Sequence, residues 1–88
     1  MVRLQVARRI DPSRLHEMMG DEDWSVRLEV ARRIHPSRLP EMMLDPDWRV
    51  RFALADKIPS KYLGLMLMRE TALEVLKIIQ ERVSTSER

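Results

Sequence analysis

The sequence VRLQVARRIDPSRLHEMMGDEDWS (residues 2–25) is followed directly by VRLEVARRIHPSRLPEMMLDPDWR (residues 26–49), and the two blocks are identical at 18 of 24 positions. A third block opens at Val50 with VRFALADKI, keeps four of the first nine residues and then diverges. A fixed period of about 20–50 residues is typical of chains that stack like units rather than wrap one closed core. We therefore predict repeats over about residues 2–25, 26–49 and 50–71 within one domain, residues 1–83.

The composition favours a small, helical, folded domain. Of the 88 residues, 44% are hydrophobic and 34% are charged, and only two are glycine. No cysteine is present, which excludes disulfides and thiolate metal sites made by this chain. The net charge of +2 is weak support for a nucleic-acid partner. Because no apolar run approaches roughly 18 residues and no signal peptide is recognisable, we expect a cytoplasmic protein without a membrane partner.

Each block is expected to begin its long helix at an acidic segment. Asp21 has the side chain of a good N-cap, and Pro46 occupies the corresponding first helical position of the next block. The pattern predicts helices over residues 22–34 and 46–58. Each helix should stop at the proline that follows it, Pro36 or Pro59, because the residue before a proline is disfavoured in the helical region.

The second element of a block is short. The segment PSRLPEMM (residues 36–43) places Leu39, Met42 and Met43 on one helical face, and Pro40 limits its length. Either two turns of α-helix or a 3₁₀ segment fits this pattern. A period of 24 residues is too short for two full helices and two turns, since helical-hairpin repeats usually have about 33 residues or more.

The third block departs from the pattern at both ends. Pro59 follows Ile58 directly, which predicts a register slip of one residue. Thr71 to Glu74 form a capping box, so we predict a capping helix over residues 72–83 and a disordered tail over residues 84–88. The first block begins inside its helix, and we expect the chain to be a fragment of a longer protein or to stack its first unit on something else.

The phrase DPDWRVR (residues 45–51), followed by an apolar helix, a proline and a short leucine-bearing segment, resembles the leucine-rich repeat variant family. The resemblance covers roughly residues 1–68. It rests on Asp45, Trp48, Val50, Arg51, Ala55 and Ile58, and on Asp21, Trp24, Val26, Arg27, Ala31, Ile34 and Leu39. It implies an all-α fold, a short right-handed α-solenoid of about three α/3₁₀ repeats plus the capping helix. HEAT-like repeats are similar more distantly, because their periods are usually longer.

Some members of the resembled family carry a cysteine cluster that binds a 4Fe–4S centre before the repeats, and they occur beside nitrogen-fixation functions. This chain has no cysteine, so we expect no cofactor. The repeat portion of such an iron–sulfur protein remains one alternative function.

An aspartate precedes an arginine by six residues in two successive blocks, at Asp21 and Arg27 and at Asp45 and Arg51, and Arg3 has the same phase. The similarity to HEAT-like repeats implies that these residues form a structural ladder between units. A site for an anion or a carboxylate ligand is the alternative.

Trp24 and Trp48 lie one period apart, and we predict that they stack on one another in the core rather than form an exposed aromatic platform. The methionines near positions 18, 42 and 66 are predicted to fill the core; an adaptable binding surface is the alternative.

Basic residues follow two lines along the predicted stack and are the candidates for partner binding: Arg8, Arg9, Arg32 and Arg33 on the long helices, and Arg14, Arg38 and Lys61 near the short ones. They could form a solvated face, bind an acidic protein or follow a phosphate backbone. Glu29 can pair with Arg33, and Asp56 interrupts the first line.

We expect a non-enzymatic scaffold for protein–protein interaction. No nucleophile lies in an activating constellation, and His16 and His35 have no metal-ligand spacing. The first block should expose the apolar residues Val2, Leu4, Val6 and Ile10, which favours a homo-oligomer or docking through this end. A nucleic-acid-binding solenoid that uses the arginine lines is the other alternative.

Overall fold

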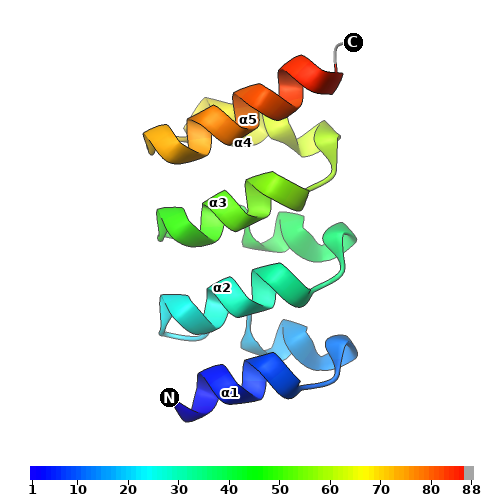
Figure 1. Cartoon of the computed structure of the whole chain (residues 1–88), viewed down its shortest axis with the longest axis vertical. Coiled ribbons are helices and arrows are strands. Elements are labelled where there is room, and N and C mark those ends of the chain that lie inside the picture. The colour runs from blue at the N-terminus through cyan, green and yellow to red at the C-terminus, as the bar shows by residue number, and fades with distance from the viewer. Residues whose placement is uncertain (87–88) are drawn as a thin grey trace.

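The computed structural model describes residues 1–86, and this part of the chain is helical without a strand. The α-helices are α1 (Val2–Arg9), α2 (Trp24–Arg33), α3 (Trp48–Lys57), α4 (Leu63–Arg69) and α5 (Leu73–Ser86). The 3₁₀ helices are η1 (Pro12–Met18), η2 (Pro36–Met42) and η3 (Ser60–Tyr62). Figure 1 shows α1, α2, α3 and α5 stacked in chain order, with the short helices in a second layer and the termini at opposite ends. The molecule measures 41 × 23 × 15 Å.

The long helices begin two residues later than predicted. Asp23 and Asp47 are the N-caps, and their carboxylates accept from the N–H groups of Ser25 at 2.8 Å and Arg49 at 2.9 Å. Asp21 instead caps the preceding turn by accepting from the N–H of Asp23 at 2.9 Å. The prediction that Asp21 is the N-cap and Pro46 the first helical residue is therefore wrong, because two capping carboxylates follow one another at this corner.

The short elements of the first two blocks are 3₁₀ helices, whereas in the third block the 3₁₀ helix η3 leads directly into the α-helix α4. The corner before each short element keeps the 24-residue period in the third block. The residues that precede them share one conformation, with φ −55° and ψ 133° at Asp11, −58° and 134° at His35, and −54° and 138° at Pro59. Pro59 thus occupies the position of His35, not that of Pro36, since its fixed φ suits this corner. The predicted register slip is wrong.

Helix α5 ends the stack, and the residue that caps its first turn precedes the predicted capping box. The carboxylate of Glu70 accepts from the N–H groups of Thr71 at 3.1 Å and Ala72 at 3.0 Å, so Glu70 performs the role assigned to Thr71 and Glu74. The helix runs through Ser86, which corrects both its predicted end and the predicted disorder of residues 84–86; residues 87–88 lie outside the described part.

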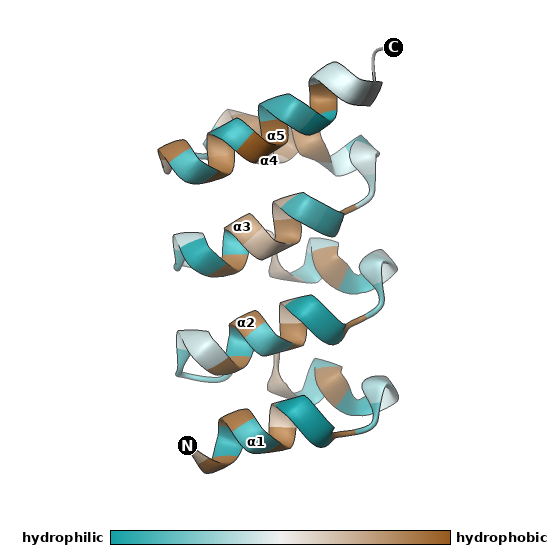
Figure 2. Cartoon of the chain, in the orientation of Figure 1, coloured by the Kyte–Doolittle hydropathy of each residue, from teal (hydrophilic) through white to brown (hydrophobic). Residues whose placement is uncertain are grey.

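The core follows the stack along its length. It contains one fully or nearly buried leucine from each block, Leu15, Leu39 and Leu63, and is completed by Val75 and Ile79 of α5. The methionines fill it as predicted: Met42 and Met66 are buried, and Met18, Met19 and Met43 pack against it. Figure 2 shows hydrophilic residues at the C-terminal ends of α1, α2 and α3, where the last two residues of each helix are charged. None of the helices in residues 1–86 is long and apolar enough to cross a bilayer.

Candidate protein-interaction surface

The predicted ladder residues come together, but with a different pairing. The guanidinium of Arg27 binds the carboxylate of Asp45, eighteen residues later, through Nε at 2.7 Å and Nη2 at 3.2 Å. Its Nη1 donates to the main-chain oxygen of Asp21, six residues earlier, at 2.7 Å. The six-residue spacing therefore joins an arginine to a carbonyl, and the side-chain pair spans two units. Only 11% of the Arg27 side chain and 4% of the Asp45 side chain are exposed.

The same arrangement recurs one unit on. Arg51 donates to the main-chain oxygen of Asp45 at 2.9 Å and binds the carboxylate of Glu70 at 2.8 and 3.0 Å. Burial alone would raise the pKa of Glu70, but the hydrogen bonds from Arg51 and from the Ala72 and Thr71 N–H groups lower it overall. In the first unit Arg3 binds Asp21 at 3.0 Å, with 54% of its side chain exposed. The buried guanidinium and carboxylate groups of Arg27, Asp45, Arg51 and Glu70 bind one another, whereas Arg3 is bonded through Nε alone.

A second set of basic side chains joins successive units through carbonyl oxygens. Arg33 donates to the main-chain oxygens of Ala7 and Ile10 at the end of α1, and Arg82 donates to the corresponding oxygens at the end of α3. Lys57 donates to the oxygen of Arg32 at 3.2 Å. Because a helix C-terminus leaves carbonyls unpaired and carries negative partial charge, cations are favoured there. Arg33 is therefore a half-buried structural residue, and its prediction as a solvent-facing partner residue is corrected.

The line of basic residues near the short helices is also paired within the chain. Arg14 binds Glu17 at 3.0 Å, and Arg38 binds Glu41 at 2.9 Å. Lys61 lies 5.3 Å from the ring centroid of Tyr62. Within the described residues, the predicted basic candidates that are exposed without a side-chain hydrogen bond or ion pair are Arg8, Arg9, Arg32 and Lys61.

The two tryptophans do not form the predicted stacked core pair. The Cζ of Arg49 lies 3.4 Å from the ring centroid of Trp24, so a guanidinium covers the first indole. Trp24 is half-buried against the core, whereas Trp48 is 42% exposed. Arg49 is held there by its own pair with Asp47, at 2.8 and 3.0 Å, and this pair lowers the pKa of Asp47 to about 2.

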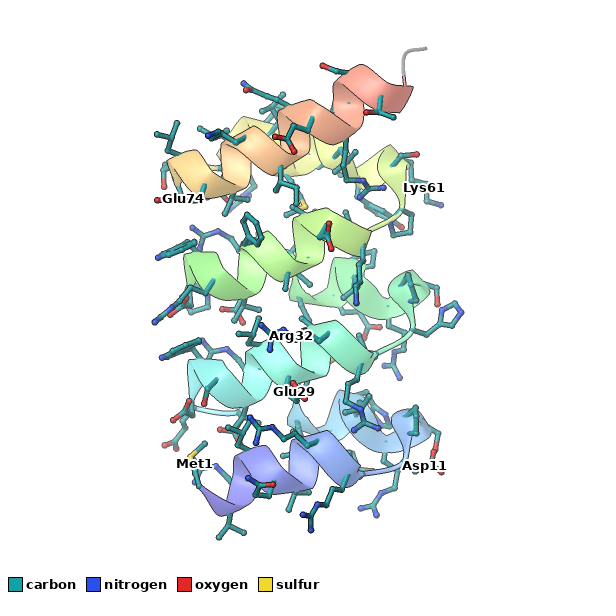
Figure 3. All side chains as sticks on the ribbon, in the orientation of Figure 1. Met1, Asp11, Glu29, Arg32, Lys61 and Glu74 are labelled. Atoms are coloured by element: carbon teal, nitrogen blue, oxygen red, sulfur yellow. The ribbon has the colours of Figure 1, made fainter. Side chains whose placement is uncertain are left out.

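An open apolar groove runs beside these aromatic residues, from α2 across α3 to the start of α5. Its apolar lining comes from Trp24, Leu28, Trp48, Phe52 and Ala53, and its charged lining from Arg32, Arg49, Asp56, Lys57 and Glu74. Phe52 is 39% exposed. Figure 3 shows Arg32 on α2 and Glu74 at the start of α5, on either side of α3. We call this surface the aromatic groove; it offers apolar area with charges of both signs beside it.

Sequence reasoning missed Arg49 and Phe52, although the repeat contained a signal for them. Arg49 stands where the first block has Ser25, and Phe52 stands where both earlier blocks have leucine. Positions at which the copies differ are less constrained by the shared packing, and here two of them contribute to one surface.

Two further observations bear on chemistry and relationship. Among residues 1–86, no group of three or more His, Cys, Asp or Glu side chains could hold a metal ion. No family model, curated protein or solved structure matches the chain.

Proposed function

We propose that this protein is a non-enzymatic helical-repeat scaffold that binds a protein partner in the aromatic groove. The observation that carries the proposal is the exposure of Trp48 and Phe52 beside each other on an apolar floor. Large exposed apolar surfaces with a polar rim are typical of protein-interaction sites, and aromatic residues supply much of the binding energy at such sites.

We further propose that the scaffold is a short right-handed α-solenoid of the leucine-rich repeat variant type. Three features support it: the alternation of α and 3₁₀ helices, the 24-residue period that places Leu15, Leu39 and Leu63 alike in the core, and the arginine links between successive units. Each helix contacts the helices of the neighbouring units, as expected for a quasi-one-dimensional stack.

A protein partner fits this surface better than a nucleic acid does. Three of the seven residues in the predicted basic lines are bound within the chain: Arg33, Arg14 and Arg38. The groove itself carries Asp56 and Glu74 beside its basic residues, and these carboxylates would repel a phosphate backbone. A partner segment with apolar side chains and charges of both signs is complementary to it.

The test is a selection of displayed peptides on the intact protein, followed by titration of labelled peptides that are enriched. The double variant Trp48→Ala and Phe52→Ala should bind them at least about tenfold more weakly, since such anchors contribute most of the affinity. Met68→Ala is the matched control, because Met68 is 84% exposed and lies outside the groove. The proposal fails if no peptide is enriched, or if the groove variant and the control bind alike. Binding of an oligonucleotide with a steep salt dependence would favour the nucleic-acid alternative instead.

A further inference from the structure

Exposed apolar side chains lie on more than one part of the molecule. On α1, Val2 is 78% exposed and Val6 is 44% exposed, whereas Leu4 and Ile10 are half-buried, so the prediction that all four are exposed was too broad. The aromatic groove combines exposed aromatic side chains with charges of both signs. The positions of these charges along the groove indicate which side chain of a partner it binds.

Helix α5 makes the same contacts as the long helix of a repeat, but with one additional residue before it. The bond between units spans 18 residues from Arg27 to Asp45 and 19 residues from Arg51 to Glu70. The bonds that α2 and α5 send back to a helix carbonyl span 26 and 27 residues. Equivalent residues of α3 and α5 are therefore separated by one residue more than the 24-residue period.

In this register Glu74 of α5 is equivalent to Arg49 of α3, and each is the second residue of its helix. The guanidinium of Arg49 covers the indole of Trp24, with Cζ 3.4 Å from the ring centroid. Next to Trp48 the equivalent position therefore carries a carboxylate, and Trp48 and Glu74 both line the aromatic groove. Figure 3 shows Glu74 at the start of α5. Within residues 1–86, no cation lies over the ring of Trp48, which is 42% exposed.

A second position of the groove also changes from basic to acidic. Asp56 of α3 is equivalent to Arg32 of α2. Asp56 and Glu74 are exposed, and neither side chain has a hydrogen bond or an ion pair in the described part of the chain. Lys57 donates to the Arg32 carbonyl, on the α2 side of the groove. The half of the groove between α3 and α5 is therefore acidic, whereas the half between α2 and α3 contains Arg32 and Arg49.

We propose that the protein partner inserts an arginine into the acidic half of the aromatic groove, with its guanidinium over Trp48 and paired with Glu74. The inference rests on the proposed function and names the side chain that the groove recognises. The chain contains its own example of such a site, since Arg49 covers Trp24 and binds the Asp47 carboxylate with two N–H groups.

Charge and geometry favour arginine over other occupants of this half of the groove. An indole face attracts a cation, and an acidic side chain would be repelled by Asp56 and Glu74. Arginine is better suited than lysine, because a planar guanidinium can stack on an indole and bind a carboxylate through two N–H groups. Its apolar stem can lie against Phe52, which is 39% exposed.

The test starts from peptides enriched on the intact protein, which should share an arginine. Exchange of this arginine for citrulline, a neutral side chain of nearly the same shape, should weaken binding by about fivefold or more, because the cation–π contact and the ion pair are both lost. Exchange for lysine should weaken binding by about threefold. In the ¹⁵N–¹H spectrum of the complex, the exchange for citrulline should move the indole signal of Trp48 and leave that of Trp24, which Arg49 already covers.

Variants of the protein locate the arginine in the groove. Glu74→Gln should weaken binding of the arginine peptide by about threefold, because the ion pair is lost, and should leave binding of the citrulline peptide unchanged. Glu81→Gln should change neither. It is the matched control, because Glu81 is an exposed glutamate of α5 that lies outside the groove.

Enriched peptides that lack an arginine but still require Trp48 and Phe52 would overturn the arginine site and leave the proposed function standing. The arginine site would also be overturned if exchange for citrulline or lysine had no effect, or if Glu74→Gln and Glu81→Gln changed binding equally. If no peptide is enriched, the proposed function fails and the arginine site fails with it.

Discussion

The bond between Arg27 and Asp45 gives the sharpest test of how the units are held together. The change is Arg27→Met, which keeps an unbranched side chain and removes the guanidinium. In the structure this group makes two bonds to the Asp45 carboxylate and one to the Asp21 carbonyl. Asp45 would retain only the N–H of Asp47, at 2.9 Å, as a donor.

Burial sets the magnitude of the effect. Because 11% of the Arg27 side chain and 4% of the Asp45 side chain are exposed, removal of one partner leaves an uncompensated charge in a nearly buried site. Such a loss lowers the free energy of unfolding by about 3–5 kcal/mol. The free energy of unfolding of a small domain is about 5–15 kcal/mol in total, so the variant loses a large part of its stability. The melting temperature should fall by about 15 °C or more.

The assay is urea unfolding followed by circular dichroism. Arg3→Met is the matched control, because Arg3 has the same phase in the first unit but is 54% exposed in its pair with Asp21. The free energy of unfolding of the control should fall by about 0–1 kcal/mol, because an exposed ion pair contributes no more than this. In the double variant Arg27→Met and Asp45→Asn, the neutral amide still accepts from the Asp47 N–H, and most of the stability should return. Equal small losses for Arg27→Met and Arg3→Met would refute the ladder as a buried link.

Three further outcomes are expected. Leu39→Ala, at a fully buried core position, should lower the free energy of unfolding by about 2–5 kcal/mol, while Leu44→Ala, at a side chain 69% exposed, should change it by less than about 0.5 kcal/mol in urea titrations. Arg33→Met should speed hydrogen exchange at the end of α1, because the carbonyls of that helix lose their donor, whereas Arg32→Met should not. Since the pKa of Asp47 is held at about 2, below its ordinary value of 3.8, its ionised form stabilises the fold above about pH 4, and this contribution is lost as the pH falls toward 2. The urea midpoint of Asp47→Asn should therefore fall less steeply between about pH 4 and pH 2 than that of the unchanged protein. The same dependence of the midpoint on pH in both proteins would contradict the role assigned to Asp47.

The repeat predicted the all-helical class and the core positions, because both follow from local pattern. The shortness of the second element followed from the 24-residue period and Pro40, and it is a 3₁₀ helix over Pro36–Met42. Helix boundaries were less predictable. Both Asp21 and Asp23 are competent caps, and only the fold decides which of them begins the helix.

The candidate surfaces were harder to predict, because exposure depends on what lies beside each helix. Trp24 and Trp48 share a phase, but Arg49 reaches back over Trp24 and nothing equivalent covers Trp48 to the same extent. Likewise Arg33 and Arg32 are adjacent in sequence, and the rotation of about 100° between them directs one to the end of α1 and the other to solvent. Sequence spacing predicts the direction in which a side chain leaves its helix, but not the residue that it contacts.

The most direct test of the proposed function is the ¹⁵N–¹H spectrum of the protein titrated with a selected peptide. The chain has two tryptophans, Trp24 and Trp48, and both line the aromatic groove, so their indole N–H signals report on it directly. The account predicts that both indole signals and the amide of Phe52 shift with saturation, while the amides of α1 do not. Shifts confined to residues outside the groove, with both indole signals unmoved, would contradict it.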